Sequence, residues 1–209
     1  MNNILPKKEL RILKKLDSPK KIQDFLNRMK MNFEEKGDTN FSPITVLKKR
    51  KCHCLEGAAL AALAMRVHGQ EPLVLDLKAS RHDFDHVVAL FKNDGMWGAI
   101  SKTNHAVLRY REPVYQSIRE LAMSYFHEYI DKKGRKSLRS YSGPVNLKKF
   151  DKLGWMTTRE EIDYIPEYLD EVKHFQILTR KQAKNLRRAD KIEIKLGNIV
   201  EWKKKKKTR

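Results

Sequence analysis

A run of small apolar side chains at residues 54–68 constrains the fold more than any other feature of the chain. The segment reads CLEGAALAALAMRVH, and a helix built from it is small and apolar on nearly every side. Such a helix packs closely against its neighbours and is typical of the centre of a domain rather than its surface. Gly69 is the expected end of the helix. The fold is therefore expected to be assembled around residues 54–68.

Apolar strands are predicted directly after this helix. Pro72 opens the strand candidate LVLDL, and residues 86–91 (HVVALF) and 96–100 (MWGAI) form two more. The intervening KNDG has the composition of a hairpin turn. The sequence predicts an α+β domain in which the central helix packs on an antiparallel sheet.

Helices are expected on both sides of this core. Residues 7–15 have amphipathic helical spacing, and Ser18-Pro19 and Ser42-Pro43 each have the cap-and-proline pattern of a helix start. Further along, residues 114–130 are predicted to form a long amphipathic helix. Thr158 and Glu161 are predicted to cap a helix that runs to Val172, and KIEIKL (191–196) reads as a strand.

The expected organisation has four parts. They are an N-terminal helical layer (1–39), the core (40–105), a mostly helical C-terminal extension packed on the core (106–202) and a disordered basic tail (203–209).

The charge is strongly positive but unevenly distributed. The formal net charge is +19 over 209 residues, yet residues 52–100 contain six acidic and only four basic residues. A dedicated nucleic-acid module usually carries its positive charge on its recognition surface. Here the basic segments surround a mildly acidic centre, so solubility is the simpler explanation. Nucleic-acid binding through the basic periphery and the Lys203–Lys207 tail stays an alternative.

The N-terminus and the apolar runs predict a cytoplasmic protein. MNNILPKKELRILKKL has charges where the apolar region of a signal peptide would stand. The longest apolar run, Ala58 to Met65, is too short to span a bilayer. Cys52 and Cys54 are separated by one residue, which suits disulfide geometry badly.

Two kinds of site use these cysteines. A metal site would combine Cys52, His53, Cys54, His82 and His86. Zinc sites usually space their cysteines by two to four residues, and residues 82–86 read as a loop entering a strand rather than a helix that would align the two histidines. No metal or cofactor is therefore expected.

The second kind of site is nucleophilic. A thiol at a helix N-terminus is stabilised as thiolate, and a histidine on a neighbouring strand can accept its proton. Cys54 stands at the start of the central helix, and His86 is the first residue of the second strand predicted after that helix (86–91). A third polar group one strand further along would orient the imidazole.

These motifs resemble the core of the transglutaminase-like superfamily, cysteine enzymes of papain-related fold. Cys54, Glu56 and Ala58 match the family's C-x-E-x-A helix start, and Asp85-His86 match its D-H strand. Gly95 and Trp97 match its G-x-W strand, whose aspartate position holds Ser101 here. The resemblance covers about residues 40–105. It assigns Cys54 as nucleophile, His86 as base and Ser101 as third member, with Asn104 as a substitute.

The resemblance implies cysteine-dependent acyl transfer, or amide or peptide hydrolysis, through a Cys54 thioester on a protein or peptide substrate. The C-terminal extension would cover the cleft. Ser101 carries no charge to stabilise an imidazolium, and no glutamine stands shortly before Cys54 as a second oxyanion donor. The alternative is therefore a catalytically degenerate domain that binds a protein or a nucleic acid.

Overall fold

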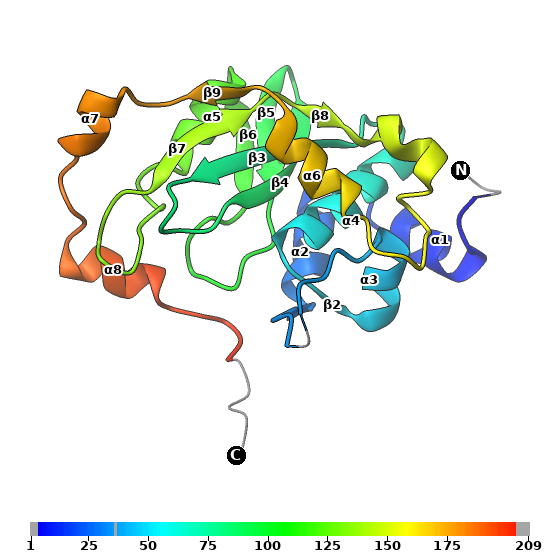
Figure 1. Cartoon of the computed structure of the whole chain (residues 1–209). Coiled ribbons are helices and arrows are strands. Elements are labelled where there is room, and N and C mark those ends of the chain that lie inside the picture. Colours follow the sequence, from blue (N-terminus) through cyan, green and yellow to red (C-terminus); the bar gives the residue numbers. More distant parts are fainter. Residues whose placement is uncertain (1–3, 36, 204–209) are drawn as a thin grey trace, which may run out of the picture.

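The central helix of the fold is α4 (Cys54–Val67), as the alanine-rich run predicts. The computed structural model describes residues 4–35 and 37–203. Within α4, every residue from Leu55 to Met65 is buried. Figure 1 shows three helices gathered around it, α1 (Lys7–Lys14), α2 (Pro19–Asn27) and α3 (Pro43–Lys49), with a sheet on its other side.

The predicted cap-and-proline starts are confirmed for two of these helices. The Ser18 hydroxyl accepts a hydrogen bond from Lys21 N, and the Ser42 hydroxyl accepts one from Thr45 N, both at 3.4 Å. In each case the proline follows in the first turn, where it has no helical partner to lose. The caps fix where α2 and α3 begin, and so the layer that holds α4 in place.

A seven-stranded antiparallel sheet forms the other layer. Its order is β6-β5-β4-β3-β7-β9, with β8 paired to β3. The strands are β3 (Leu73–Ala79), β4 (His86–Asn93), β5 (Met96–Ile100), β6 (Arg111–Tyr115), β7 (Leu138–Ser142), β8 (Val145–Asn146) and β9 (His174–Gln176). The predicted hairpin between β4 and β5 is confirmed, because Asn93 pairs with Met96. Asp94 and Gly95 between them both have positive φ (48° and 79°), as the tight hairpin turn requires.

The sheet separates two hydrophobic clusters. Val87 and Ala89 of β4 pack on the α4 side. Val88 and Leu90 lie in the opposite cluster, with side chains of α5 (Ile118–Ser124). The buried core therefore lies on both faces of the sheet, and α4 fills the larger part. A short parallel pair, β1 (Lys30–Met31) with β2 (Lys51–Cys52), leads into α4.

The second half departs from the predicted elements. Residues 114–130 do not form one helix, because Pro113-Val114 belong to β6 and only Ile118–Ser124 are helical as α5. The sheet thus continues beyond residues 40–105, and residues 106–202 supply strands as well as helices. Proline has no N–H for a helix and suits an edge strand, which β6 is.

Two further predictions in this half are wrong. Residues 191–196 lie in α8 (Lys191–Gly197), where Asp190 and Glu193 form a capping box that overrides the alternating pattern. The Thr158–Glu161 capping box is absent, because Glu161 instead accepts a hydrogen bond from Asn40 N. The remaining helices are η1 (Leu147–Leu153), α6 (Tyr164–Glu171) and α7 (Arg180–Lys184).

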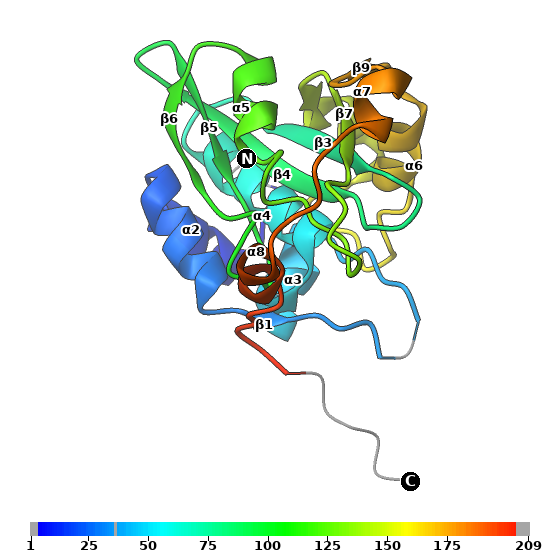
Figure 2. The ribbon, with the colours of Figure 1, turned by 90° about the vertical axis from the view of Figure 1, so that its left-hand side faces the viewer.

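The C-terminal segment returns to the core at the end of the described chain. In Figures 1 and 2 it runs from β9 through α7 to α8, and then past the loop that follows β5. Ala106 N donates to Ile199 O at 3.0 Å, which fixes this contact. No helix in residues 4–35 or 37–203 combines the length and apolar character that a bilayer crossing requires. Most of the predicted basic tail, Lys204 onward, lies outside the described residues.

Candidate functional site

The two cysteines lie in different environments, and both are free thiols. Cys52 is fully buried in the short strand β2, with its Sγ 3.9 Å from Met29 Sδ. Cys54 is the first residue of α4 and is partly exposed. At that position the unpaired N–H groups of the helix lie next to the sulfur and favour negative charge on it.

His86 and Ser101 meet on adjacent strands. The register pairs Ala89 with Ile100, which places Ser101, one residue past β5, beside the start of β4. His86 Nε2 lies 2.8 Å from Ser101 Oγ, and both side chains are buried. The structure therefore brings together the histidine and serine that the sequence assigned to the base and third-member positions.

The hydrogen bonds of Ser101 set the tautomer of His86. Ser101 Oγ lies 2.5 Å from Leu108 O, a carbonyl that can only accept, so the hydroxyl proton points there. The same oxygen must then accept from His86, which places a proton on Nε2. The Nδ1 lone pair of a neutral His86 is left free to accept a proton from Cys54.

The side chain of Gln23 in α2 holds the backbone of Ser101 and makes no use of the Ser101 hydroxyl. Gln23 Nε2 donates to Ser101 O at 2.8 Å, and Ser101 N donates to Gln23 Oε1 at 2.9 Å. Gln23 is buried. Sequence reasoning did not identify this residue, and its only signal was a polar side chain within the apolar spacing of residues 22–33.

Two histidines, not one, influence the ionisation of the Cys54 thiol. Burial alone would raise the pKa of the Cys54 thiol, but hydrogen bonds from His53 and His86 and their charges lower that pKa well below its usual range. For Cys52 the balance is reversed, since burial raises its pKa to about 12. Cys54 is thus the thiol of the pair that ionises more readily. His53 lies in the same site, although the sequence analysis named it only for the metal alternative. Its signal was its place at the helix N-cap, directly before the cysteine.

Glu56 organises the approach to this helix start. It is fully buried, and its carboxylate accepts hydrogen bonds from Asn32 Nδ2, Phe41 N and His53 N at 2.9–3.1 Å. Every one of these partners donates, so Glu56 acts purely as an acceptor. Its role is to hold the loops in front of α4 and to cap the helix.

Asn104 does not take the third-member position. Its side chain forms a pair of hydrogen bonds with the backbone of Trp202: Nδ2 donates to Trp202 O at 3.0 Å, and Oδ1 accepts from Trp202 N at 2.8 Å. Asn104 therefore anchors the C-terminal segment, and Ser101 alone of the two contacts His86.

A cavity of about 740 Å³ lies in front of the thiol. His53, Cys54 and His86 line it, with Phe84 on the loop before β4 and Ile194 on α8. Phe84 is 85% exposed, which is unusual for an aromatic side chain. The C-terminal extension therefore forms part of the cleft wall, while Cys54 stays partly exposed.

Only three of the five residues of the metal alternative come together in the described structure: His53, Cys54 and His86 line the larger cavity. His82 is exposed on the loop before β4 and contacts Arg81, and Cys52 faces Met29. Among residues 4–35 and 37–203, the one group with metal-like spacing is Asp76, Asp85 and Asp170. The Lys78 ammonium already bridges Asp85 and Asp170, so this cluster is a set of ion pairs.

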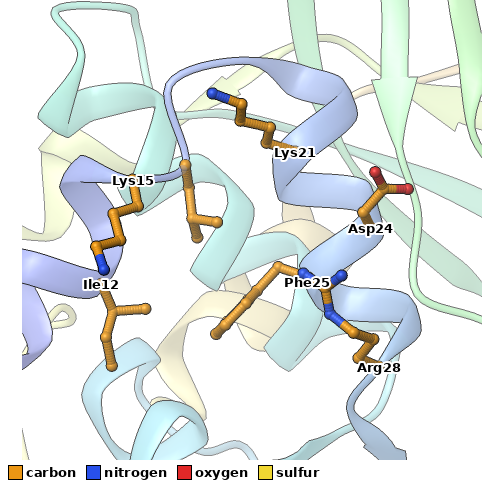
Figure 3. Close-up of a pocket in the computed structure, with 7 residues that line it drawn as sticks. Ile12, Lys15, Lys21, Asp24, Phe25 and Arg28 are labelled. Atoms are coloured by element: carbon orange, nitrogen blue, oxygen red, sulfur yellow. The ribbon is translucent and has the colours of Figure 1, made fainter.

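A second, smaller pocket lies between α1 and α2, away from Cys54 (Figure 3). Its volume is about 380 Å³. Ile12, Leu16 and Phe25 provide apolar surface, and Lys15, Lys21, Asp24 and Arg28 surround it. Its lining contains neither a cysteine nor a histidine.

No protein-family model matches the chain, and a comparison with curated proteins found no match to its sequence.

Proposed function

We propose that this protein is a transglutaminase-like enzyme that carries out cysteine-dependent acyl transfer, or amide or peptide hydrolysis, through a thioester on Cys54. The observation that carries the proposal is the alignment of the Cys54 thiol, the His86 imidazole and the Ser101 hydroxyl at the N-terminus of a buried helix. It agrees with the resemblance of residues 40–105 to the transglutaminase-like core. A reducing, cytoplasmic compartment would keep both cysteines as thiols.

The first half of the reaction forms the thioester. The Cys54 proton passes to His86 Nδ1, and the sulfur attacks the substrate carbonyl to give a tetrahedral intermediate. Backbone N–H groups in the first turn of α4 stabilise the oxyanion. When the C–N bond breaks, the His86 proton goes to the leaving amine and the acyl group stays on Cys54.

The second half releases the acyl group. Water gives its proton to His86 and attacks the thioester in hydrolysis, and an amine does so in acyl transfer. The S–C bond breaks and the thiol is restored. Ser101 holds His86 in the required tautomer through both halves, but as a neutral group it adds no charge to stabilise the imidazolium.

An acyl-capture experiment tests this function. With p-nitrophenyl acetate, a nucleophilic Cys54 expels p-nitrophenolate and retains the acetyl group. We expect a burst of one p-nitrophenolate per protein and an acetyl group on the Cys54 peptide by mass spectrometry. The burst should be absent in Cys54→Ala and His86→Ala and kept in His127→Ala, which changes an exposed histidine. A native protein with no burst contradicts the enzyme.

The pocket between α1 and α2 favours a second candidate function, a binding module without catalysis. Lys15, Lys21 and Arg28 give it a cationic rim that fits an acidic partner or nucleic acid (Figure 3). Binding of single-stranded RNA that persists at physiological salt and is lost in Arg28→Ala would support this function. Binding that disappears as salt rises reflects net charge alone.

A further inference from the structure

We infer that α8 and the turn after it form a docking surface for an anionic lipid bilayer, in which exposed aliphatic side chains enter the headgroup region and lysines contact the charged lipids. In Figure 1, α8 lies at the edge of the molecule, next to the described end of the chain. The docking surface is the outer side of α8, because the inner side lines the Cys54 cavity. Docking there does not require acyl transfer at Cys54, and so stands apart from the proposed enzyme.

Exposed aliphatic side chains follow one face of α8, and the helix has no buried residue. The exposed fractions are 77% for Ile192, 48% for Leu196, 53% for Ile199 and 37% for Val200. The spacing of i, i+4, i+7 and i+8 places them on one helical face. Ile199 N donates to Leu196 O at 3.1 Å, which continues the turn past the end of α8. An exposed apolar stripe of this kind marks an interaction surface.

The opposite face of α8 is fixed to the rest of the molecule. Lys136 Nζ donates to Glu193 Oε1 at 2.7 Å. Ile194 packs against Gly134, where an added Cβ would lie 2.9 Å from Ile194 Cδ1. Because these contacts hold the inner face, the aliphatic stripe cannot turn inward without breaking them. Its exposure is therefore a property of the fold.

The charges beside the stripe suit a negative partner. The acidic residues of 187–203 are all in ion pairs: Asp190 with Arg187, Glu193 with Lys136 and Glu201 with Arg109. Lys191, Lys195 and Lys203 are exposed, and none of them belongs to an ion pair within the described part of the chain. The sequence carries four more lysines directly after Lys203. Lysines close to an anionic membrane surface strengthen binding to it.

A bilayer fits this combination better than the other possible occupants. Single-stranded nucleic acid stacks its bases on aromatic rings, and the stripe is aliphatic. A groove in another protein encloses a helix on several sides, but one face of α8 already packs on its own chain. A symmetric contact between two copies would bring Lys191 and Lys195 close to like charges. A flat anionic bilayer accepts both the aliphatic groups and the lysines.

Co-sedimentation of the full chain with lipid vesicles tests the docking surface. One set of vesicles contains about two parts phosphatidylcholine to one part phosphatidylserine, and the other contains phosphatidylcholine alone. At physiological salt we expect partitioning onto the mixed vesicles to be at least roughly 10-fold stronger than onto phosphatidylcholine. Protein that stays in solution with both kinds of vesicle, or binds both equally, overturns the inference.

Ile192→Ser combined with Leu196→Ser removes aliphatic surface and keeps every charge. Both side chains are exposed, so the core is untouched. We expect partitioning onto the mixed vesicles to fall at least roughly 10-fold. The matched control is Val114→Ser combined with Leu153→Ser, which changes aliphatic side chains of similar exposure (62% and 56%) on β6 and η1. Equal partitioning of the two double variants shows that net charge alone drives binding, and the docking surface is then wrong.

Lys191→Gln combined with Lys195→Gln tests the charges and leaves the aliphatic stripe in place. Binding to the mixed vesicles should fall roughly 10-fold, and binding to phosphatidylcholine should not change. Lys7→Gln combined with Lys8→Gln removes the same charge from exposed positions of α1 and should bind like the native protein. Equal losses in the two variants contradict a docking surface at α8.

Two further readouts identify a different occupant. Single-stranded RNA that binds at the same salt, when the mixed vesicles do not, assigns the lysines to nucleic acid and overturns the inference. Light scattering without vesicles reports self-association. A dimer that Ile192→Ser with Leu196→Ser dissociates, without vesicle binding by the native protein, assigns the stripe to a second copy and also overturns it. A monomer that binds the mixed vesicles supports the docking surface.

Discussion

Cys52 and Cys54 are two residues apart, yet the strand β2 and the first turn of α4 give them opposite chemistry. Cys52 is buried next to Met29, and the charge of Lys102 also acts on it. Burial raises the pKa of the Cys52 thiol to about 12. Cys54 has hydrogen bonds from two imidazoles that outweigh the effect of burial and lower its pKa. The difference shows that a single step of the chain, from strand to helix start, decides which of the two thiols ionises more readily.

The largest expected effect is on the relative reactivity of the two thiols. At pH 7 only roughly one in 10⁵ molecules of a thiol with pKa near 12 is thiolate, while the pKa of Cys54 is lowered; the greater nucleophilicity of a more basic thiolate recovers roughly 10²-fold. Brief iodoacetamide treatment with peptide mass spectrometry should label Cys54 on the order of 1000-fold faster than Cys52. Comparable labelling of both in folded protein would contradict the contrast.

The next effect is on stability at alkaline pH. Because the folded pKa of Cys52 is raised, the unfolded chain loses this proton from about pH 8.5 while the native protein keeps it to about 12. The unfolded state then binds fewer protons, so stability falls as pH rises through this window. Cys52 should contribute a loss of about 2–3 kcal/mol between pH 8.5 and 10.5.

Urea unfolding at both pH values checks this loss. Cys52→Ala should remove this part of the decline, and Cys54→Ala should retain it. Equal declines in native protein and Cys52→Ala would show that Cys52 is not protected from ionisation.

Sequence alone was sufficient for the features that depend on local pattern. The run from Ala58 to Met65 predicts a buried helix because small apolar residues on all sides leave no solvent face. The positions of His86 and Ser101 follow from a tight hairpin, since the turn fixes the register that pairs them. Cys54 could be separated from Cys52 because only Cys54 lies at the helix start.

The rest depends on contacts between distant segments. His53 was named only for the metal alternative because its neighbours Thr39 and Glu34 lie on a distant loop of the sequence. Asn104 was a plausible substitute only while its partner Trp202 was unknown. Residues 191–196 alternate like a strand, but the cap at Asp190 makes them a helix.

A smaller effect, on stability, tests the close packing of Gly57 in α4 against Lys102 and Cys52. A Cβ on Gly57 would lie 2.5 Å from Lys102 Cβ and 3.6 Å from Cys52 Sγ, so the glycine permits the loop after β5 to touch α4. Gly57→Ala should destabilise the protein by about 1–3 kcal/mol through overpacking. Thermal unfolding measures it, with Gly197→Ala as control because nothing lies within 4 Å of the added Cβ there. Equal melting temperatures for the two variants would mean that Lys102 moves freely.

The smallest expected effect isolates what the hydroxyl of Ser101 adds to Cys54. Ser101→Ala removes the acceptor for His86 Nε2, while Gln23 still holds the backbone in place. A neutral hydrogen bond contributes about 1 kcal/mol, or roughly 5-fold in rate. The acetylation burst should slow by about that factor, and Ser101→Thr, which keeps the hydroxyl, should restore it. A loss of several orders of magnitude in Ser101→Ala would instead make Ser101 the dominant partner of His86. The difference between Cys54 and Cys52 would then depend on the serine more than on the two imidazoles.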